Sequence, residues 1–147
     1  MNMVVTTGSD EVWRPIAGAL GYEISNLGRV KSLARTVQRR SRWGGVSSHT
    51  VRERVLKPGR RSGYPLFAVH VGDRQLTLYI HEQVMAAFGT TKPFPKAMIR
   101  HLDDNTSNCR IDNLEWGTQQ QNMADAKRNG HQLGGYRPKG FRSADWR

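Results

Sequence analysis

Apolar and polar residues alternate in the middle of the chain. Leu66–Val71 and Gln75–Ile80 each place an apolar side chain at every second position over part of their length, and a Gly-Asp-Arg turn at 72–74 separates them. A period of two puts these side chains on one face of a strand. The two segments therefore predict a β-hairpin. In its second strand we expect the core face to carry Leu76, Leu78 and Ile80.

A helical period follows the hairpin. Val84, Met85 and Phe88 lie on one face of a helix predicted from His81 to Phe88, and Gly89 is placed to end it. The next segment contains two prolines at 93 and 95 and is expected to be extended.

A second patterned unit begins at Met98-Ile99. A polar, turn-rich loop separates this short apolar run from another at Leu114–Trp116. Thr118 and Gln121 have the spacing of a capping box, which predicts a helix running to about Asn129. The order strand, polar loop, strand, helix can bring the first loop residues, the second strand and the first helical turns together.

Short strands are also expected near the N-terminus. Tyr22, Ile24 and Val30 surround a Ser-Asn-Leu-Gly turn, in which Gly28 can supply a positive φ. Arg29 and Lys31 flank Val30 and would share one strand face. Residues 1–10 are expected to form a frayed leader.

The most basic stretch is 35–61, which contains nine Lys and Arg residues and only one acidic residue, Glu53. No helical or strand period precedes Val51. This composition predicts an arm without regular structure that orders on a phosphate backbone. A solubilising loop without a partner is the alternative.

Composition narrows the class of partner. The 147 residues carry 23 Lys and Arg against 12 Asp and Glu, a net charge of +11, which points to a polyanion. Nucleic acid is favoured over a membrane surface, because no apolar run approaches the roughly 18 residues of a membrane span. The N-terminus lacks a signal-peptide pattern, so we expect a cytoplasmic protein. The single cysteine, Cys109, excludes an intramolecular disulfide and a zinc site built on several cysteines.

Three polar residues of the second unit carry candidate chemistry. The neutral imidazole of His101 can accept a proton from water. The amide of Asn113 can accept the imidazole N–H and fix its tautomer, and the amide oxygen of Asn122 suits a hard cation such as Mg²⁺. Each residue alone has an ordinary structural explanation. Together they suit a site that cuts a phosphodiester bond.

The pattern of these residues resembles the ββα-metal motif of HNH endonucleases of the phage and intron-encoded homing type. Tyr79-Ile80-His81 resembles the helix start that precedes this motif, and segments upstream are similar to a nuclease-associated modular (NUMOD-like) DNA-binding segment. The resemblance covers about residues 11–130. The matching positions are Trp13–Ile16, Tyr22–Val30, Leu56–Pro58, Gly63-Tyr64, Val84, Ala87, Phe88, His101, Asp103, Asn105, Asn108, Asn113–Trp116, Thr118 and Asn122.

The resemblance implies an α+β fold: a small N-terminal β-rich segment followed by a ββα-metal (His-Me finger) nuclease core. The expected divisions are a DNA-binding segment at 11–70, a nuclease core at 71–130 and a basic C-terminal tail at 131–147. The implied activity is metal-dependent hydrolysis of DNA, by nicking or by double-strand cutting. The implied setting is a bacterial or phage-infected cell.

The resemblance also implies roles for single residues. His101 would be the general base, Asn113 would orient it, and Asn122 would hold a divalent metal, most simply Mg²⁺, with Mn²⁺ as the other candidate. Many relatives carry Asp before the histidine, where this chain has Arg100. The second metal ligand would then be His81 or Asp103, unless Arg100 grips a phosphate itself; a third possibility is a copy that cuts poorly. His81 is otherwise a buried histidine at a helix start.

The expected partner is double-stranded DNA, bound by a monomer or a homodimer and without a membrane. A protein that keeps the HNH fold and binds DNA without cutting it is the main alternative, and an RNA-binding protein is a weaker one. The predicted DNA contacts are Arg29, Lys31, Arg35, Arg39, Arg40, Arg42, Arg100 and Arg128.

Overall fold

The computed structural model describes residues 10–130. The predicted leader at 1–10, except Asp10, and the predicted basic tail at 131–147 lie outside these residues. The chain begins with an antiparallel sheet in the order β1-β2-β3-β6. Its strands are β1 (Trp13–Pro15), β2 (Tyr22–Ser25), β3 (Val30–Ser32) and β6 (Arg54–Val55).

A separate antiparallel ribbon leaves this sheet between β3 and β6, and a second sheet follows. The ribbon pairs β4 (Arg35–Arg40) with β5 (Val46–Val51). The second sheet has the order β7-β8-β9. Its strands are β7 (Gly59–Arg61), β8 (Tyr64–Val71) and β9 (Arg74–Tyr79).

The C-terminal half contains the two α-helices of the described residues. Helix α1 (Ile80–Phe88) follows β9 directly. The strand pair β10 (Met98–His101) and β11 (Leu114–Gly117) encloses a loop that ends in a short 3₁₀ helix, η1 (Ile111–Asn113). Helix α2 (Gln119–Arg128) closes the unit. The predicted order of strand, polar loop, strand and helix is therefore confirmed.

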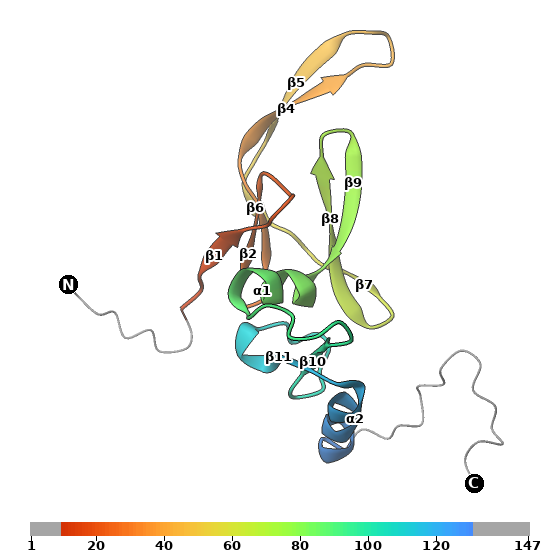
Figure 1. The fold of residues 1–147 in the computed structure, drawn as a ribbon. Coiled ribbons are helices and arrows are strands. Elements are labelled where there is room, and N and C mark those ends of the chain that lie inside the picture. The colour runs from red at the N-terminus through yellow and green to blue at the C-terminus, as the bar shows by residue number, and fades with distance from the viewer. Residues whose placement is uncertain (1–9, 131–147) are drawn as a thin grey trace, which may run out of the picture.

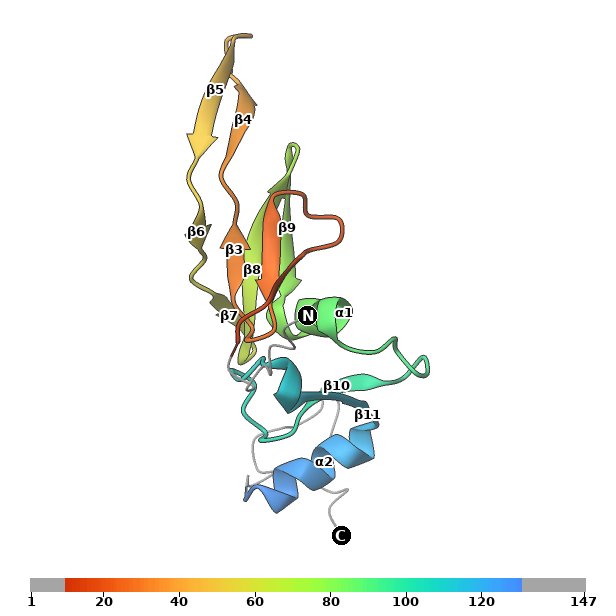
Figure 2. The same cartoon turned by 90° about the vertical axis from the view of Figure 1, so that its left-hand side faces the viewer.

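The molecule is elongated, with the β4–β5 ribbon at one end and α2 at the other (Figure 1). A view turned by 90° shows the same separation and places α1 between the strand-rich half and the β10–β11 pair (Figure 2). Helix α1 contacts β2, β8, β9, β10 and η1. It therefore joins the two halves of the chain.

One hydrophobic core serves both halves. Its buried side chains include Ile24 and Val69 from the strand-rich half, Val84 from α1 and Leu114 from β11. The expected division at 70/71 falls inside β8, one residue before its end. The two segments thus share buried side chains, and burial of this common apolar surface stabilises both.

The β8–β9 hairpin is confirmed, but its core face is mainly that of β8. Phe67 and Val69 are buried, whereas Leu76 is 39% exposed. Leu76 pairs with Val69 and so lies on the same face, yet β9 is the edge strand of its sheet. The expectation that Leu76 belongs to the core is therefore wrong. Ile80 is buried, as the first residue of α1.

The expectation of an arm without regular structure at 35–61 is also wrong. Six residue pairs connect β4 to β5, from Arg35↔Val51 to Arg40↔Val46. Most side chains on both faces of this ribbon are exposed, so no buried face imposes a period of two on the sequence. The strands form because backbone groups pair across the ribbon and because Thr and Val favour extended backbone.

The predicted turn at Ser25–Gly28 connects the halves at a second point. Gly28 has φ +80°, and a Cβ placed there would lie 3.0 Å from both Cβ and the carbonyl oxygen of Cys109, in the β10–β11 loop. The Ile111 amide, a little further along this loop, donates to the carbonyl of Asn26 over 2.9 Å. The turn therefore needs glycine for both its backbone conformation and its close approach.

Replacing Gly28 with alanine is expected to destabilise the protein by about 2 kcal/mol, from the positive φ and the contact with Cys109. Gly18→Ala is the matched control, because Gly18 has φ +75° and a Cβ added there would meet nothing within 4 Å. Urea unfolding of the two variants measures the difference. Equal losses of stability would show that the approach to Cys109 costs nothing.

Both helices agree closely with their predicted bounds. The capping box of α2 is confirmed, with the Gln121 amide donating to Thr118 Oγ1 over 3.2 Å and the Thr118 amide donating to Gln121 Oε1 over 2.8 Å. Gly130 follows α2 with φ +77°. Neither helix of residues 10–130 has the length and apolar character that crossing a membrane requires.

Candidate active site

His101 is the last residue of β10 and is buried, with 5% of its surface exposed. It pairs with Leu114 of β11, so the strand pair fixes its backbone. Its ring centroid lies 5.5 Å from that of His81, in the first turn of α1. The structure thus brings together two of the predicted site residues that are 20 positions apart.

Two tyrosine rings complete the surroundings of the histidines. The Tyr64 centroid lies 5.2 Å from the His81 ring and 6.0 Å from the His101 ring. Tyr79 lies 5.7 Å from His81. Within this aromatic cluster, Nδ1 of His81 and Nε2 of His101 are buried without a hydrogen-bond partner among the described residues. Buried polar atoms are normally paired, so these two nitrogens mark the position as a candidate for ligand binding.

Both imidazoles are held neutral at physiological pH. Burial, reinforced by the neighbouring His101, lowers the pKa of His81 to about 4. Burial also lowers the pKa of His101, although Asp103 and Asp104 oppose this change. A neutral imidazole has a lone pair that can accept a proton or coordinate a cation.

In metal-free buffer, these shifts predict that the free energy of unfolding falls as the pH is lowered from about 6.5 towards 4. In that range the unfolded chain protonates its histidines while the folded protein keeps His81 neutral. Urea unfolding with chelator at several pH values measures the slope. His81→Gln should reduce the slope, and His70→Gln, at an exposed position on β8, should not. Equal slopes in all three proteins would contradict this prediction.

Asn113 organises the loop that follows His101. Its Oδ1 accepts from the Asp103 amide over 3.1 Å, and its Nδ2 donates to Asp103 Oδ1 and to the Asn108 carbonyl, both over 2.9 Å. Its own carbonyl accepts from Leu102, next to His101. The amide is therefore bonded to the loop rather than to the imidazole, and it acts on His101 only through the backbone.

The Asp103 carboxylate is hydrogen-bonded within the loop that follows His101. Besides the bond from Asn113, its Oδ1 accepts from the Asn105 amide and its Oδ2 from Asn108 Nδ2. These bonds hold the carboxylate within its own turn. Of the two alternative ligands considered from the sequence, the geometry favours His81.

Asn122 lies in the first half of α2 and lines a pocket of about 940 Å³. His81, Tyr64 and Tyr79 line the same pocket, together with Trp116 of β11. The capping box at Thr118 sets the start of α2, and with it the position of Asn122 one turn later. Asn122 and His81 thus line a common space large enough for a phosphate group, and His101 is not among its lining residues.

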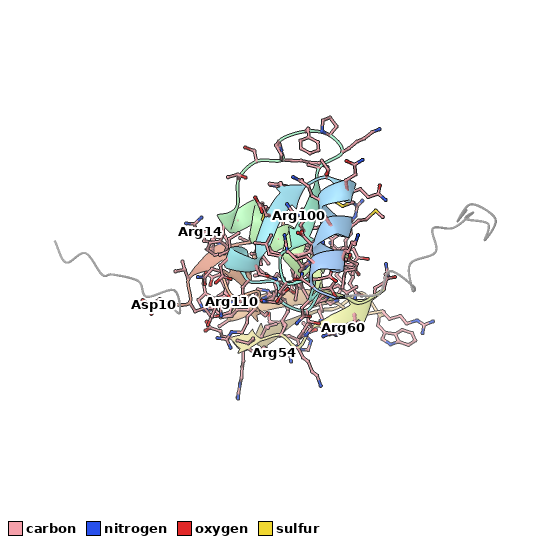
Figure 3. All side chains as sticks on the ribbon, turned by 90° about the horizontal axis from the view of Figure 1, so that it is seen from below. Asp10, Arg14, Arg54, Arg60, Arg100 and Arg110 are labelled. Atoms are coloured by element: carbon pink, nitrogen blue, oxygen red, sulfur yellow. The ribbon has the colours of Figure 1, made fainter. Side chains whose placement is uncertain are left out.

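Arg100, a predicted phosphate contact, is paired within the protein. Its Nε and Nη2 donate to Oδ2 of Asp125 over 2.8 and 2.5 Å, and its side chain is 11% exposed. Figure 3 shows Arg100 near α2, the helix that carries its partner Asp125. A Cβ on Gly117 would meet Arg100 Cδ at 2.1 Å, so the glycine makes room for this side chain. Arg100 therefore ties β10 to α2, and its contact with DNA stays a prediction.

Three other predicted DNA contacts are engaged within the protein. Arg35 donates to the carbonyls of Gly21 and Leu33 and to the Tyr22 hydroxyl, which holds the base of the ribbon on the first sheet. Arg29 is bonded to Glu11. Lys31 lies 3.6 Å from Glu23 and 4.3 Å from the Trp13 ring centroid.

The remaining predicted contacts are more exposed. Arg39, Arg40 and Arg42 are exposed on the β4–β5 ribbon and form no ion pair within residues 10–130. The side chain of Arg128 is 65% exposed, although its Nη2 donates to Asp125 Oδ1 over 2.6 Å.

Tyr64 and Asp125 were not identified as site residues from the sequence, although Gly63-Tyr64 matches the modular segment. Tyr64 follows the β7–β8 turn, far from the motif in the chain, and only the fold brings it to the histidines. The β7–β8 turn is hydrogen-bonded to the loop between β10 and β11, because Thr106 Oγ1 donates to the Gly63 carbonyl over 2.8 Å. Asp125 lies 25 positions after Arg100, and only the fold places the two side chains together.

A strand pair and a helix around a buried histidine define the ββα-metal class of nuclease fold. Residues 84–124 match the family described as HNH endonuclease, and residues 11–70 match the NUMOD4 motif. The chain thus matches a NUMOD4 segment followed by an HNH endonuclease segment. The predicted α+β fold is thereby confirmed.

Two individual proteins are similar over most of this chain. The uncharacterised HNH endonuclease L247 of Acanthamoeba polyphaga mimivirus is 27% identical over 125 residues, which are 81% of this chain and 27% of that protein. The HNH homing endonuclease I-HmuI, solved to describe its DNA binding and cleavage, matches with a TM-score of 0.60 and 24% identity, covering 82% of this chain and 60% of that one. The chain thus spans about a quarter of the length of the curated relative.

Proposed function

We propose that this protein is a metal-dependent endonuclease that hydrolyses phosphodiester bonds of double-stranded DNA. The observation that carries the proposal is the buried His101, whose Nε2 has no hydrogen-bond partner among residues 10–130 and whose ring centroid lies 5.5 Å from that of His81, which lines a pocket with Asn122. The HNH family and the NUMOD4 segment support it.

In this proposal His101 is the general base that takes a proton from the attacking water. Asn113 acts as a positioning residue, because it holds the loop that begins at His101. Tyr64, whose ring centroid lies 6.0 Å from that of His101, contributes to the burial that keeps His101 neutral and able to accept that proton.

The donor set fits a divalent cation. The imidazole of His81 and the pocket-lining amide of Asn122 are neutral donors, and a phosphate with water would supply the oxygen ligands that Mg²⁺ or Mn²⁺ prefers. No group of three His, Cys, Asp or Glu residues suited to a metal occurs in the described part. Asn122 and His81 would hold the ion, which supplies charge stabilisation at the scissile phosphate when bound.

The duplex would be bound through the β4–β5 ribbon. Arg39, Arg40 and Arg42 are exposed there without acidic partners, so they can neutralise phosphates and release counterions. These contacts predict affinity that falls steeply with salt and carry no direct sequence information.

Supercoiled plasmid, incubated with Mg²⁺ or Mn²⁺ and with chelator, tests the proposal. Conversion to open-circle or linear DNA with metal, and none with chelator, is the expected result. Asn122→Ala should lose this activity while binding the plasmid as the wild type does. Cleavage that persists in chelator, or that Asn122→Ala leaves unchanged, would refute the proposed site.

A non-catalytic DNA-binding protein is the second candidate. Arg100, paired with Asp125, stands where many relatives carry an acidic residue, and this favours a fold that binds without cutting. Salt-sensitive binding with no cleavage in any divalent metal, in protein shown to be folded, would select this candidate.

A further inference from the structure

The tip of the β4–β5 ribbon carries an indole that the protein itself does not cover. Trp43 is 93% exposed, and Val46, three residues later, is 65% exposed. Among the described residues Trp43 makes no aromatic or cation–π contact. Leaving a side chain of this size in water forgoes the stabilisation that its burial would give. Its position therefore requires an explanation outside the core.

The turn that carries Trp43 is ordered by its own hydrogen bonds. Ser41 Oγ accepts from the Trp43 amide over 3.0 Å, and the Ser41 carbonyl accepts from Gly44 over 3.1 Å. The Ser41 amide donates to Gly45 over 2.6 Å, which closes the loop. The backbone of the tip is thus set before any partner arrives, which lowers the entropic cost of using it.

The surroundings of Trp43 are cationic. Arg39, Arg40 and Arg42 precede it, and no acidic residue occurs from 35 to 52. Each six-residue strand spans about 20 Å, so the tip stands well away from the sheet that holds its base. An apolar ring surrounded by arginines suits a partner that is anionic outside and apolar inside. Duplex DNA has this character, because its phosphates enclose stacked base pairs.

We propose that Trp43 inserts between neighbouring bases of the DNA duplex and unstacks one base step, while the flanking arginines hold the adjacent phosphates. This inference rests on the proposed DNA partner. We call the inserted Trp43 side chain the wedge. Apolar side chains at base steps kink the duplex, so the wedge would also bend the DNA. Because the ribbon and α2 lie at opposite ends of the molecule, the wedge would act at a distance from the cleavage site (Figure 1).

The test measures binding of a mixed-sequence duplex by the full chain in chelator, over a range of salt concentrations. Trp43→Ala should weaken binding by about fivefold to a hundredfold at every salt concentration, because base stacking is not screened. Its slope of log affinity against log salt should equal that of the wild type. Arg40→Ala should instead reduce the slope by up to about 0.9, the value for one phosphate.

Leu20→Ala is the matched control, because Leu20 is 92% exposed on a turn outside the ribbon. It should bind as the wild type does. Duplex binding should also quench the wild-type indole emission more than that of Trp43→Phe. An unchanged affinity in Trp43→Ala, an altered slope, or an effect seen only with single strands would overturn the proposal.

Sedimentation of the free protein separates a second explanation. If Trp43→Ala dissociates a dimer, the tip binds another copy of the chain and the wedge is refuted. The binding assay is independent of cleavage. If the wild-type protein binds the duplex but does not cleave it, the proposed endonuclease activity is refuted and the wedge is not. If the wild type cleaves DNA and Trp43→Ala binds normally, the wedge is refuted and the endonuclease activity is not.

Discussion

Replacing His101 with alanine is expected to lower the rate of plasmid cleavage by about 10²- to 10⁴-fold, the usual loss when a general base is removed. The variant lacks the only side chain that the proposal assigns to proton transfer from water. Its affinity for duplex DNA should stay within about twofold of wild type, because the predicted phosphate contacts lie on the ribbon. Single-turnover cleavage with Mg²⁺ and binding in chelator measure the two effects separately.

His49→Ala is the control for this experiment, because His49 is an exposed histidine on β5, outside the site. It should cleave at the wild-type rate once DNA is saturating. Wild-type cleavage by His101→Ala would contradict the assignment of the base. An equal loss of binding and cleavage would instead indicate that His101 supports the fold.

Removing Asp125 should produce the largest loss of stability. Its side chain is 2% exposed and accepts from both Arg100 and Arg128. Asp125→Ala leaves the guanidinium of Arg100, 11% exposed, without its main partner, which costs about 3 to 5 kcal/mol in buried ion pairs. Urea unfolding should show this decrease, and α2 should lose protection from hydrogen exchange first.

Two further variants make the experiment specific. Asp112→Ala removes an ion pair whose carboxylate is 65% exposed, and it should cost less than about 1 kcal/mol. The double variant Arg100→Met with Asp125→Leu should recover much of the lost stability, because no unpaired charge remains. If Asp125→Ala costs no more than Asp112→Ala, the pair does not tie α2 to β10.

The elements predicted from the sequence are those with a local signal. The capping box at Thr118 gives the start of α2, and the alternation around Gly72 gives the β8–β9 hairpin. The ribbon escapes prediction because both its faces are solvated, so its sequence has no apolar period. The prediction for Leu76 is wrong because a period of two identifies the apolar face of a strand. It does not tell how far along that face the core extends.

The site is predictable in part, for the same reason. His101, Asn113 and Asn122 lie within one local unit, so their spacing can be interpreted. Tyr64 reaches the histidines only through the pairing of β7 with β8 and the packing of that sheet on α1. The structural role of Arg100 was not predicted, because its partner, Asp125, lies 25 positions later and opposite it only in the folded protein.

The core that the two segments share limits how such a chain can be recombined. Val84 of α1 is fully buried among side chains contributed by both segments, so exchanging the NUMOD4 segment for another would leave α1 with an unmatched apolar surface. A transplanted DNA-recognition segment would need apolar side chains that pack against α1, or it would have to evolve together with α1. Modular inheritance in this architecture therefore depends on the helix between the modules as much as on the modules themselves.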